Sequence, residues 1–259
     1  MIRRINWYFE LSGNELDRLE VMVDFAATQG AGLRTVFVED ENLLRCGELP
    51  CSREISMMTG RVRPLSRQQL EGQLRRRREL VERRLEALAR RRTLEWSREV
   101  IRGRRDQLLI AGTEDDIAAL LLNEAAEPLP AWLAILRRPL LLLSSRFRPV
   151  NQLLIVCDNP SDVELLTQAR ELAGQQHWPL WVLVPTARVK ELMPILRREE
   201  LDTAMLPLGH WSLSAWLAAG TDRASLLMVR ADSPVLVGAS SRGINAALLL
   251  PAVKGGSAK

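Results

Sequence analysis

The sequence predicts an α/β protein of two tandem domains, each a mostly parallel sheet flanked by helices, the second of them abbreviated. Two observations carry this prediction. Apolar segments that read as strands alternate with segments of helical periodicity, as parallel sheets require, because a crossover helix must return the chain between parallel strands. The same alternation begins again beyond the middle of the 259 residues, which indicates an internal repeat in layout.

Composition limits the class of protein. Hydrophobic residues make up 47% and charged residues 26% of the chain, a balance typical of soluble globular proteins. The most apolar segment, 128–143, is interrupted by Arg137, Arg138 and Pro139 and is too short to span a bilayer. No signal peptide is recognisable at the N-terminus. We therefore expect a cytoplasmic protein with no membrane partner.

Cysteine and histidine usage argues against a metal site. The chain has 3 cysteines and 2 histidines, and His177 and His210 lie far in sequence from Cys46 and Cys51. An odd number of cysteines without regular spacing does not indicate a disulfide framework. A reversible Cys46–Cys51 pair remains open at this point.

The first half opens with a βαβ unit. Ile5–Leu11 is predicted to be a strand, Glu15–Thr28 an amphipathic helix, and Leu33–Val38 a second strand. The polar connection Glu39–Pro64 is too long for an ordinary loop, so we expect a helical turn within it.

A long helix and a third strand follow this connection. Ser66 is a suitable N-cap for a helix over Arg67–Arg92, in which leucines and a valine recur on one stripe while arginines occupy most other positions. Leu94–Ile101 alternates in the manner of a strand.

The end of the first half is predicted to contain a fourth strand, a helix and a fifth strand. Gln107–Ala111 is assigned to the fourth strand, Thr113 caps the helix, and Pro139–Leu143 is an apolar strand. The basic segment 144–149 is the expected domain boundary, so that the first domain covers residues 1–145.

The second half repeats this layout. Gln152–Cys157 and Leu180–Val184 are predicted strands, with the helix Ser161–Ala173 between them. The short helix Arg188–Glu200 leads almost directly into the strand Thr203–Leu208, which is why this copy is abbreviated.

The last predicted unit starts with a glycine turn at Gly209. A helix through Val229 and a strand over Pro234–Val237 follow it, which completes a second domain over residues 150–240. We expect residues 241–259 to form a flexible C-terminal tail.

Two segments resemble a known family. LRTVFVEDENLLRCGELPCSREI, residues 33–55, and GTDRASLLMVRADSPVLV, residues 220–237, together with the layout of both halves, resemble two universal stress protein domains in tandem. The resemblance implies Rossmann-like domains with five-stranded parallel sheets. It also implies, in many members, ATP binding by an aspartate that ends the first strand and by a G-x-x-G-x9-G-[ST] loop after the fourth.

Transferred to this chain, the resemblance assigns a vestigial nucleotide site to the second half. Asp158 takes the place of the aspartate, Gly220 and Thr221 take that of the closing glycine–hydroxyl pair, and Gly209 is one residue out of register. Pro207 and His210 then occupy the two earlier glycine positions. Because those glycines let backbone N–H groups approach phosphate, their loss predicts that a triphosphate is no longer held. Asp158 could alternatively be a helix N-cap.

The first half departs further from the pattern. Glu10 and Ser12 stand near the position of the aspartate, but Gly112 and Thr113 are followed by three carboxylates, residues 114–116. Negative side chains repel phosphate oxygens in a partly dry site. This half is predicted to have lost nucleotide binding.

Positive charge is concentrated in one segment. Residues 61–105 contain 16 arginines and 6 glutamates, a net charge of +10, whereas the whole chain carries +4. A candidate interaction face on the predicted long helix consists of Arg75, Arg76, Arg78, Arg83 and Arg84. Such a face could bind nucleic acid, but few aromatic side chains accompany it, so a solvated helix face balanced by glutamates is the favoured interpretation.

The sequence therefore predicts a non-catalytic regulatory or interaction protein of the universal stress protein type. No Ser–His–Asp order, HExxH or P-loop is present, so we expect no enzyme activity, no cofactor and no metal. Protein partners, which the sequence does not identify, and homo-oligomers are the expected contacts. One alternative is a sensor that binds ATP or AMP through the second domain alone, and another is a nucleic-acid-associated protein that uses the arginine-rich helix.

Overall fold

A computed structural model describes residues 3–11, 19–56, 58–110, 117–122, 133, 135–144, 147–198, 204–208, 224–236 and 244–251. The chain forms two compact units, Ile2–Ala111 (the first unit) and Gly112–Lys259 (the second unit). The division therefore falls before the expected boundary at 144–149. Each unit is described by itself below.

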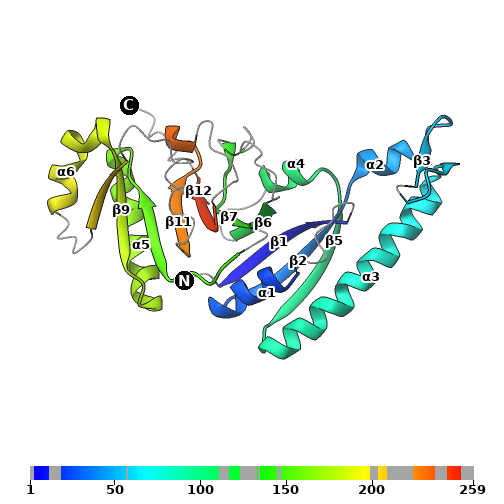
Figure 1. The fold of residues 1–259 in the computed structure, drawn as a ribbon, viewed down its shortest axis with the longest axis horizontal. Helices are drawn as coiled ribbons and strands as arrows, with labels where there is room; N and C mark the ends of the chain where they lie inside the picture. The colour runs from blue at the N-terminus through cyan, green and yellow to red at the C-terminus, as the bar shows by residue number, and fades with distance from the viewer. Residues whose placement is uncertain are drawn as a thin grey trace, which may run out of the picture. The chain divides into compact units, whose positions relative to one another are not determined.

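The first unit is built on three parallel strands, β1 (Arg4–Glu10), β2 (Gly32–Glu39) and β5 (Trp96–Arg102), in the order β5-β2-β1 (Figure 1). Helices α1 (Leu19–Thr28) and α3 (Arg67–Arg92) lie side by side. The core contains Trp7, Phe9 and Phe37, which are fully buried and pack edge to face with ring centroids 5.0 and 5.9 Å apart. The predicted βαβ opening is confirmed.

Helix α3 forms where its capping and apolar pattern predict it. The Oγ of Ser66 accepts a hydrogen bond from the N–H of Gln69 at 3.3 Å, and the helix ends at Thr93, which adopts a left-handed conformation with φ of 54°. One stripe of the helix is buried, and it consists of Leu70, Leu74, Val81, Leu85 and Ala89. The buried stripe fixes which arginines face solvent.

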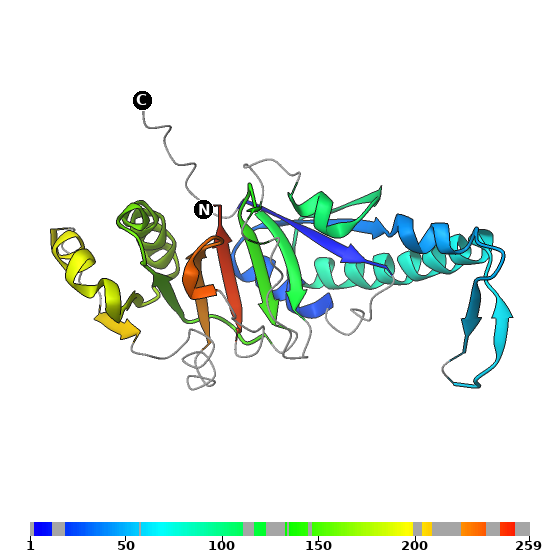
Figure 2. The same cartoon turned by 90° about the horizontal axis from the view of Figure 1, so that it is seen from above.

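The long connection before α3 holds more structure than one helical turn. It contains α2 (Glu41–Cys46), capped by Asp40, and a hairpin of two short antiparallel strands, β3 (Arg53–Ile55) and β4 (Val62–Pro64). The hairpin projects from the end of α3 away from the sheet (Figure 2).

In its described residues, the second unit contains seven strands, in the order β10-β9-β8-β11-β12-β7-β6. All neighbouring strands are parallel except β12 and β7, which are antiparallel. The strands are β6 (Ile117–Leu122), β7 (Leu140–Ser144), β8 (Gln152–Val156), β9 (Leu180–Pro185), β10 (Ala204–Leu208), β11 (Ser225–Arg230) and β12 (Ala246–Leu250). Helices α5 (Val163–Gln176) and α6 (Val189–Arg198) form the predicted crossovers of the second half.

The same strand order appears in both halves of the chain. In β5-β2-β1 and in β10-β9-β8, the third, second and first strands of each half lie next to one another in that order. The predicted α/β class with a mostly parallel sheet is confirmed. The antiparallel β7–β12 contact joins the fifth strand of one half to the fifth strand of the other.

Two predicted elements at the end of the first half are wrong. Residues assigned to the fourth strand form helix α4 (Arg105–Ile110), and Ile117–Leu122, assigned to the following helix, form β6. The central residues of β6, 118–121, are all buried. A short, continuously apolar run carries no periodicity, so the sequence pattern does not separate a buried strand from a buried helix.

The same ambiguity explains why the last predicted elements of the second half are wrong. Ser225–Arg230, predicted as the end of a helix, is strand β11, and the predicted strand at Pro234–Val237 instead contains a 3-10 helix, Pro234–Leu236. The expected C-terminal tail contributes β12, whose five residues are all buried between β11 and β7. Burial on both sides explains why this strand is entirely apolar.

The position of β12 yields a stability prediction. Replacing Leu249, which is fully buried, by alanine is expected to lower the free energy of unfolding by about 2–5 kcal/mol because the substitution leaves a cavity. The measurement is urea unfolding followed by circular dichroism. The control is Leu80→Ala in α3, where the side chain is 48% exposed. If both variants lowered the free energy of unfolding by the same small amount, the burial of Leu249 in strand β12 would be contradicted.

Candidate functional site

The candidate site of the second unit lies where β8 and β11 are neighbours. The strands that succeed them, β9 and β12, lie on opposite sides of this pair, so the strand order reverses at this point. In open parallel sheets such a switch point leaves a crevice at the carboxyl ends of the strands, where ligands bind. The residues at these ends are Cys157–Asp162 after β8 and Arg230–Ser233 at the end of β11.

Asp162 is the buried centre of this site. Its side chain is 1% exposed, and one carboxylate oxygen accepts hydrogen bonds from the backbone N–H groups of Asp158 and Asn159 at 3.0 and 2.9 Å. The other oxygen lies 2.6 Å from the Nε of Arg230. The carboxylate therefore holds the loop after β8 and pairs with a cation from β11.

Arg230 connects three segments at this edge of the sheet. Besides the ion pair, its guanidinium donates to the carbonyl of Ser161 at 3.2 Å and to that of Pro251, the residue after β12, at 3.1 Å. Only 11% of the arginine side chain is exposed. Each of its three nitrogens therefore donates at least one hydrogen bond within the protein.

Asp158, the predicted nucleotide-binding aspartate, lies beside this ion pair. The side chain is buried, and its Oδ2 accepts a hydrogen bond from the hydroxyl of Ser233. Burial raises the pKa of Asp158, the Ser233 hydrogen bond acts in the opposite direction, and the neighbouring Asp162 raises the pKa further. Ser233 also accepts from the N–H of Val235 at 3.3 Å, which fixes the turn after β11.

The alternative role proposed for Asp158, a helix N-cap, does not match the structure. The residue at the N-cap of α5 is Asp162, and its side chain makes no capping hydrogen bond. The adjacent Cys157 is buried, and burial raises its pKa to about 12, so the thiol is protonated at neutral pH and is a poor nucleophile.

The structure thus brings together one predicted site residue and three that the sequence did not identify. Asp158 is at the switch point, whereas the predicted Gly209, Gly220 and Thr221 lie outside the described residues. Arg230 and Ser233 were missed because β11 was assigned to a helix, and Asp162 was missed because it was placed inside the predicted helix Ser161–Ala173. An arginine at the end of an otherwise apolar run, SLLMVR, is the signal that could have drawn attention to this edge.

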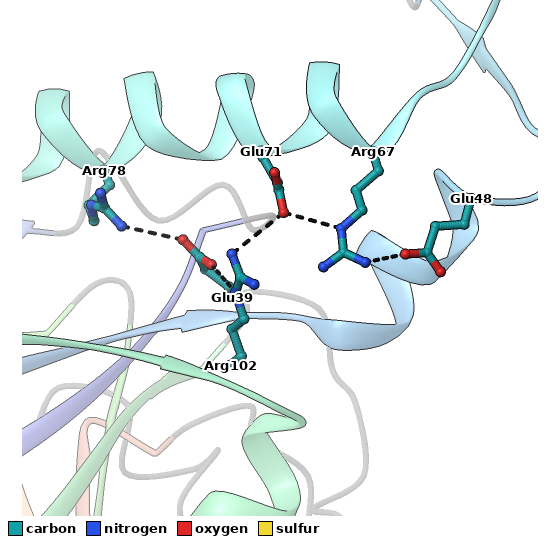
Figure 3. A network of polar contacts seen from close by, with 6 residues as sticks. All are labelled: Glu39, Glu48, Arg67, Glu71, Arg78 and Arg102. Carbon is teal, nitrogen blue, oxygen red and sulfur yellow. Dashed lines mark hydrogen bonds and ion pairs between the residues drawn. The ribbon is translucent and has the colours of Figure 1, made fainter.

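The candidate interaction face on α3 is the second predicted site. Arg78 lies 3.3 Å from Glu39 at the end of β2, and that glutamate also lies 3.0 Å from Arg102 of β5. Glu71 continues the network to Arg102 and Arg67, and Arg67 in turn pairs with Glu48 (Figure 3). The network links α3 with the carboxyl ends of two strands and with the segment after α2.

The other predicted face residues differ in their partners. Arg84 lies 3.6 Å from Glu20 of α1, and Arg83 donates to the backbone carbonyl of Glu79. Arg75 and Arg76 are exposed and have no ion pair with the part of the chain that the structure describes. Of the five arginines, Arg78 and Arg84 are therefore paired with carboxylates of other elements, and the choice between a solvated helix face and a nucleic-acid interface stays a prediction.

Among the described residues, no helix is both long and apolar enough to cross a bilayer, and histidine, cysteine and acidic side chains do not gather in a group that could bind a metal ion.

Comparisons with known proteins give a fold but no sequence family. No family pattern matches the chain, and no curated protein is similar to it in sequence. Among solved structures, a universal stress protein from Archaeoglobus fulgidus superposes with a TM-score of 0.65 at 12% identity, and the alignment covers 96% of each chain. The fold is that of a universal stress protein. A functionally unknown protein from Pseudomonas aeruginosa matches with a TM-score of 0.52 and 12% identity over 96% of this chain and 92% of that one.

The buried ion pair predicts a large cost of breaking it. Asp162→Ala is expected to lower the free energy of unfolding by about 3–5 kcal/mol, because Arg230 is left buried without a counter-ion. Asp162→Asn keeps an oxygen for the two backbone N–H groups and should cost less. The control is Glu191→Ala, which breaks the exposed Arg188 pair and should cost about 0–1 kcal/mol in the same unfolding measurement.

The raised pKa of Asp158 predicts a pH dependence of stability. The folded protein holds the proton on Asp158 more tightly than the unfolded chain does, so unfolding releases a proton between the two pKa values. The free energy of unfolding should therefore fall as the pH rises from the ordinary aspartate pKa through the raised one. Asp158→Asn should abolish this decline, and Glu171→Gln on α5 should leave it unchanged. Identical pH profiles for wild type and Asp158→Asn would contradict the assignment.

Proposed function

We propose that this chain is a non-catalytic stress-response protein of the universal stress protein type, which acts through regulation or protein interaction and has largely lost nucleotide binding. The observation that carries the proposal is that polar side chains at the switch point bond to one another. Asp158 accepts from Ser233, and Arg230 pairs with Asp162. These internal bonds engage the carboxylate and the guanidinium that lie nearest to the switch point.

The free-energy cost of breaking these internal bonds supports the proposed loss of nucleotide affinity. A ligand hydroxyl that replaced Ser233 on Asp158 would leave the buried serine hydroxyl without this acceptor. A phosphate that recruited Arg230 would separate it from Asp162 and leave that carboxylate buried without its cation. In either case the protein loses an internal bond when it forms the bond with the ligand. Net affinity would then have to come from other contacts.

Tandem organisation is part of the same proposal. The repeated strand order and the antiparallel contact of β7 with β12 support two related halves that pair as a pseudo-dimer. We further propose a cytoplasmic protein without enzyme activity or resident cofactor, whose partners are proteins, a second copy included, rather than nucleic acid.

The second candidate is an adenine-nucleotide sensor that uses the second half alone. It is favoured by one observation, the position of Asp158 at the carboxyl end of β8 beside the switch point. In that case Arg230 would exchange Asp162 for phosphate, and the ligand would reorganise the network rather than fill an open site.

Nucleotide content and ligand-dependent stability separate the two candidates. Protein purified without added nucleotide and extracted by heat is expected to release no adenine nucleotide, as measured by absorbance and mass. ATP or AMP should leave the melting temperature unchanged in wild type, in Asp158→Ala and in the matched control Glu171→Gln. A ligand at a hundred times its Kd would stabilise the fold by about 2.7 kcal/mol. Stoichiometric bound nucleotide, or a shift that Asp158→Ala removes, would establish the sensor instead.

A further inference from the structure

The β3–β4 hairpin exposes apolar side chains that the fold does not use. Within the part of the chain that the structure describes, β3 and β4 pair only with each other. Four large apolar side chains of this region are exposed, namely Leu49 (53%), Ile55 (64%), Met58 (96%) and Val62 (53%). A two-stranded hairpin gains little stability from such exposure, so these residues indicate a contact with something outside the fold.

The two faces of the hairpin differ in chemistry. Ile55 pairs with Val62 on one face, and Glu54 pairs with Arg63 on the other, because side chains alternate along a strand. Arg63 lies 2.7 Å from Glu54 and lowers its pKa, and the side chain of Gln73 on α3 also hydrogen-bonds to Glu54. The polar face is therefore turned toward α3, and the apolar face is turned away from it.

Positive charge accompanies the apolar face. Arg53 lies on the same face as Ile55, Arg61 precedes Val62, and both arginines are exposed. Glu54 is the one acidic residue between positions 49 and 64, and Arg63 neutralises it. A surface that complements the hairpin must be negatively charged and must also accept apolar side chains.

Four backbone amides of the turn at the tip have acceptors within the turn. The N–H of Gly60 donates to the carbonyl of Ser56 at 2.7 Å, and the N–H of Ser56 donates to the carbonyl of Arg61 at 2.9 Å. The N–H groups of Thr59 and Arg61 donate to the hydroxyls of Ser56 and Thr59 at 3.3 and 3.5 Å. These amides can leave water without losing a hydrogen-bond partner, which is the condition for entering a lipid interface.

We propose that the hairpin is a peripheral docking site for an anionic phospholipid surface, with Ile55, Met58 and Val62 inserted at the interface and Arg53 and Arg61 on lipid phosphates. Charge complementarity and the four internally bonded amides of the tip favour this occupant. A second copy seated through the same face would bring the arginines of two hairpins together. The proposal does not depend on the loss of nucleotide binding, and it differs from the sequence-based expectation of no membrane partner.

Sedimentation of the full chain with vesicles tests the proposal. The protein should bind phosphatidylcholine vesicles that contain about 30% phosphatidylglycerol and should not bind phosphatidylcholine alone. Binding should weaken between about 0.1 M and 1 M salt, as the Debye length falls from about 10 to 3 Å. Ile55→Ser, Met58→Ser and Val62→Ser combined should abolish binding. Each of Arg53→Gln and Arg61→Gln should lower the partition coefficient about fivefold.

Matched controls lie on α3 of the same unit. Leu80→Ser removes an apolar side chain that is 48% exposed, and Arg90→Gln with Arg91→Gln removes two exposed arginines. These arginines are at the far end of a helix of 26 residues, about 39 Å long. Both controls should bind like wild type, because the contact is confined to the hairpin.

Three outcomes would overturn the proposal: no binding to anionic vesicles, equal binding to neutral vesicles, or undiminished binding by the hairpin variants. Sizing chromatography gives a fourth, since a dimer that the serine variants dissociate would make a second copy the occupant. Met58→Cys with Cys46→Ser and Cys51→Ser allows an environment-sensitive dye at the tip. Its emission should shift to the blue with anionic vesicles, and an unchanged spectrum would place the tip in water.

Discussion

The ion pair between Asp162 and Arg230 organises the carboxyl edge of the second unit. Arg230 reaches the loop after β8 and the residue after β12, while Asp162 holds the backbone of Asp158 and Asn159. One guanidinium, at the end of the fourth strand of this half, therefore links the segments that follow the first and the fifth strands. Because two buried charges are tolerated only when both are paired and hydrogen-bonded, loss of either residue would leave the other buried without its partner.

Local pattern was enough to predict much of the fold. The opening βαβ unit, the capped helix α3 and the crossover helices of the second half have clear periodicity or caps, so their types follow from nearby residues. The strands β6, β11 and β12 do not. Each is a short apolar run whose type is set by burial between neighbouring strands, and that burial depends on partners far away in sequence.

The candidate site, like the fold, could be predicted only in part from nearby residues. Asp158 could be placed because it directly follows a recognisable strand, and the carboxyl ends of parallel strands are where ligands bind. Its partner Ser233 is 75 residues away, and Arg230 is 68 residues from Asp162. Once β11 was assigned to a helix, no local feature could place Arg230 at the same edge of the sheet. A motif comparison finds positions that match the motif, but it does not find Asp162, Arg230 and Ser233, which the motif does not contain.

Charge in the sequence and charge on the surface also differ. Residues 61–105 carry a net charge of +10, yet α3 pairs many of its arginines with carboxylates of α1, β2 and its own preceding turns. Glu39, with 11% of its side chain exposed, shows how such pairs tie the helix to the strands beneath it. The hairpin differs from α3 in this respect. Its one carboxylate, that of Glu54, pairs with Arg63, and its apolar side chains face away from α3. The arginine-rich helix therefore contributes to the fold through these pairs, and the exposed apolar side chains of Ile55, Met58 and Val62 lie on the hairpin.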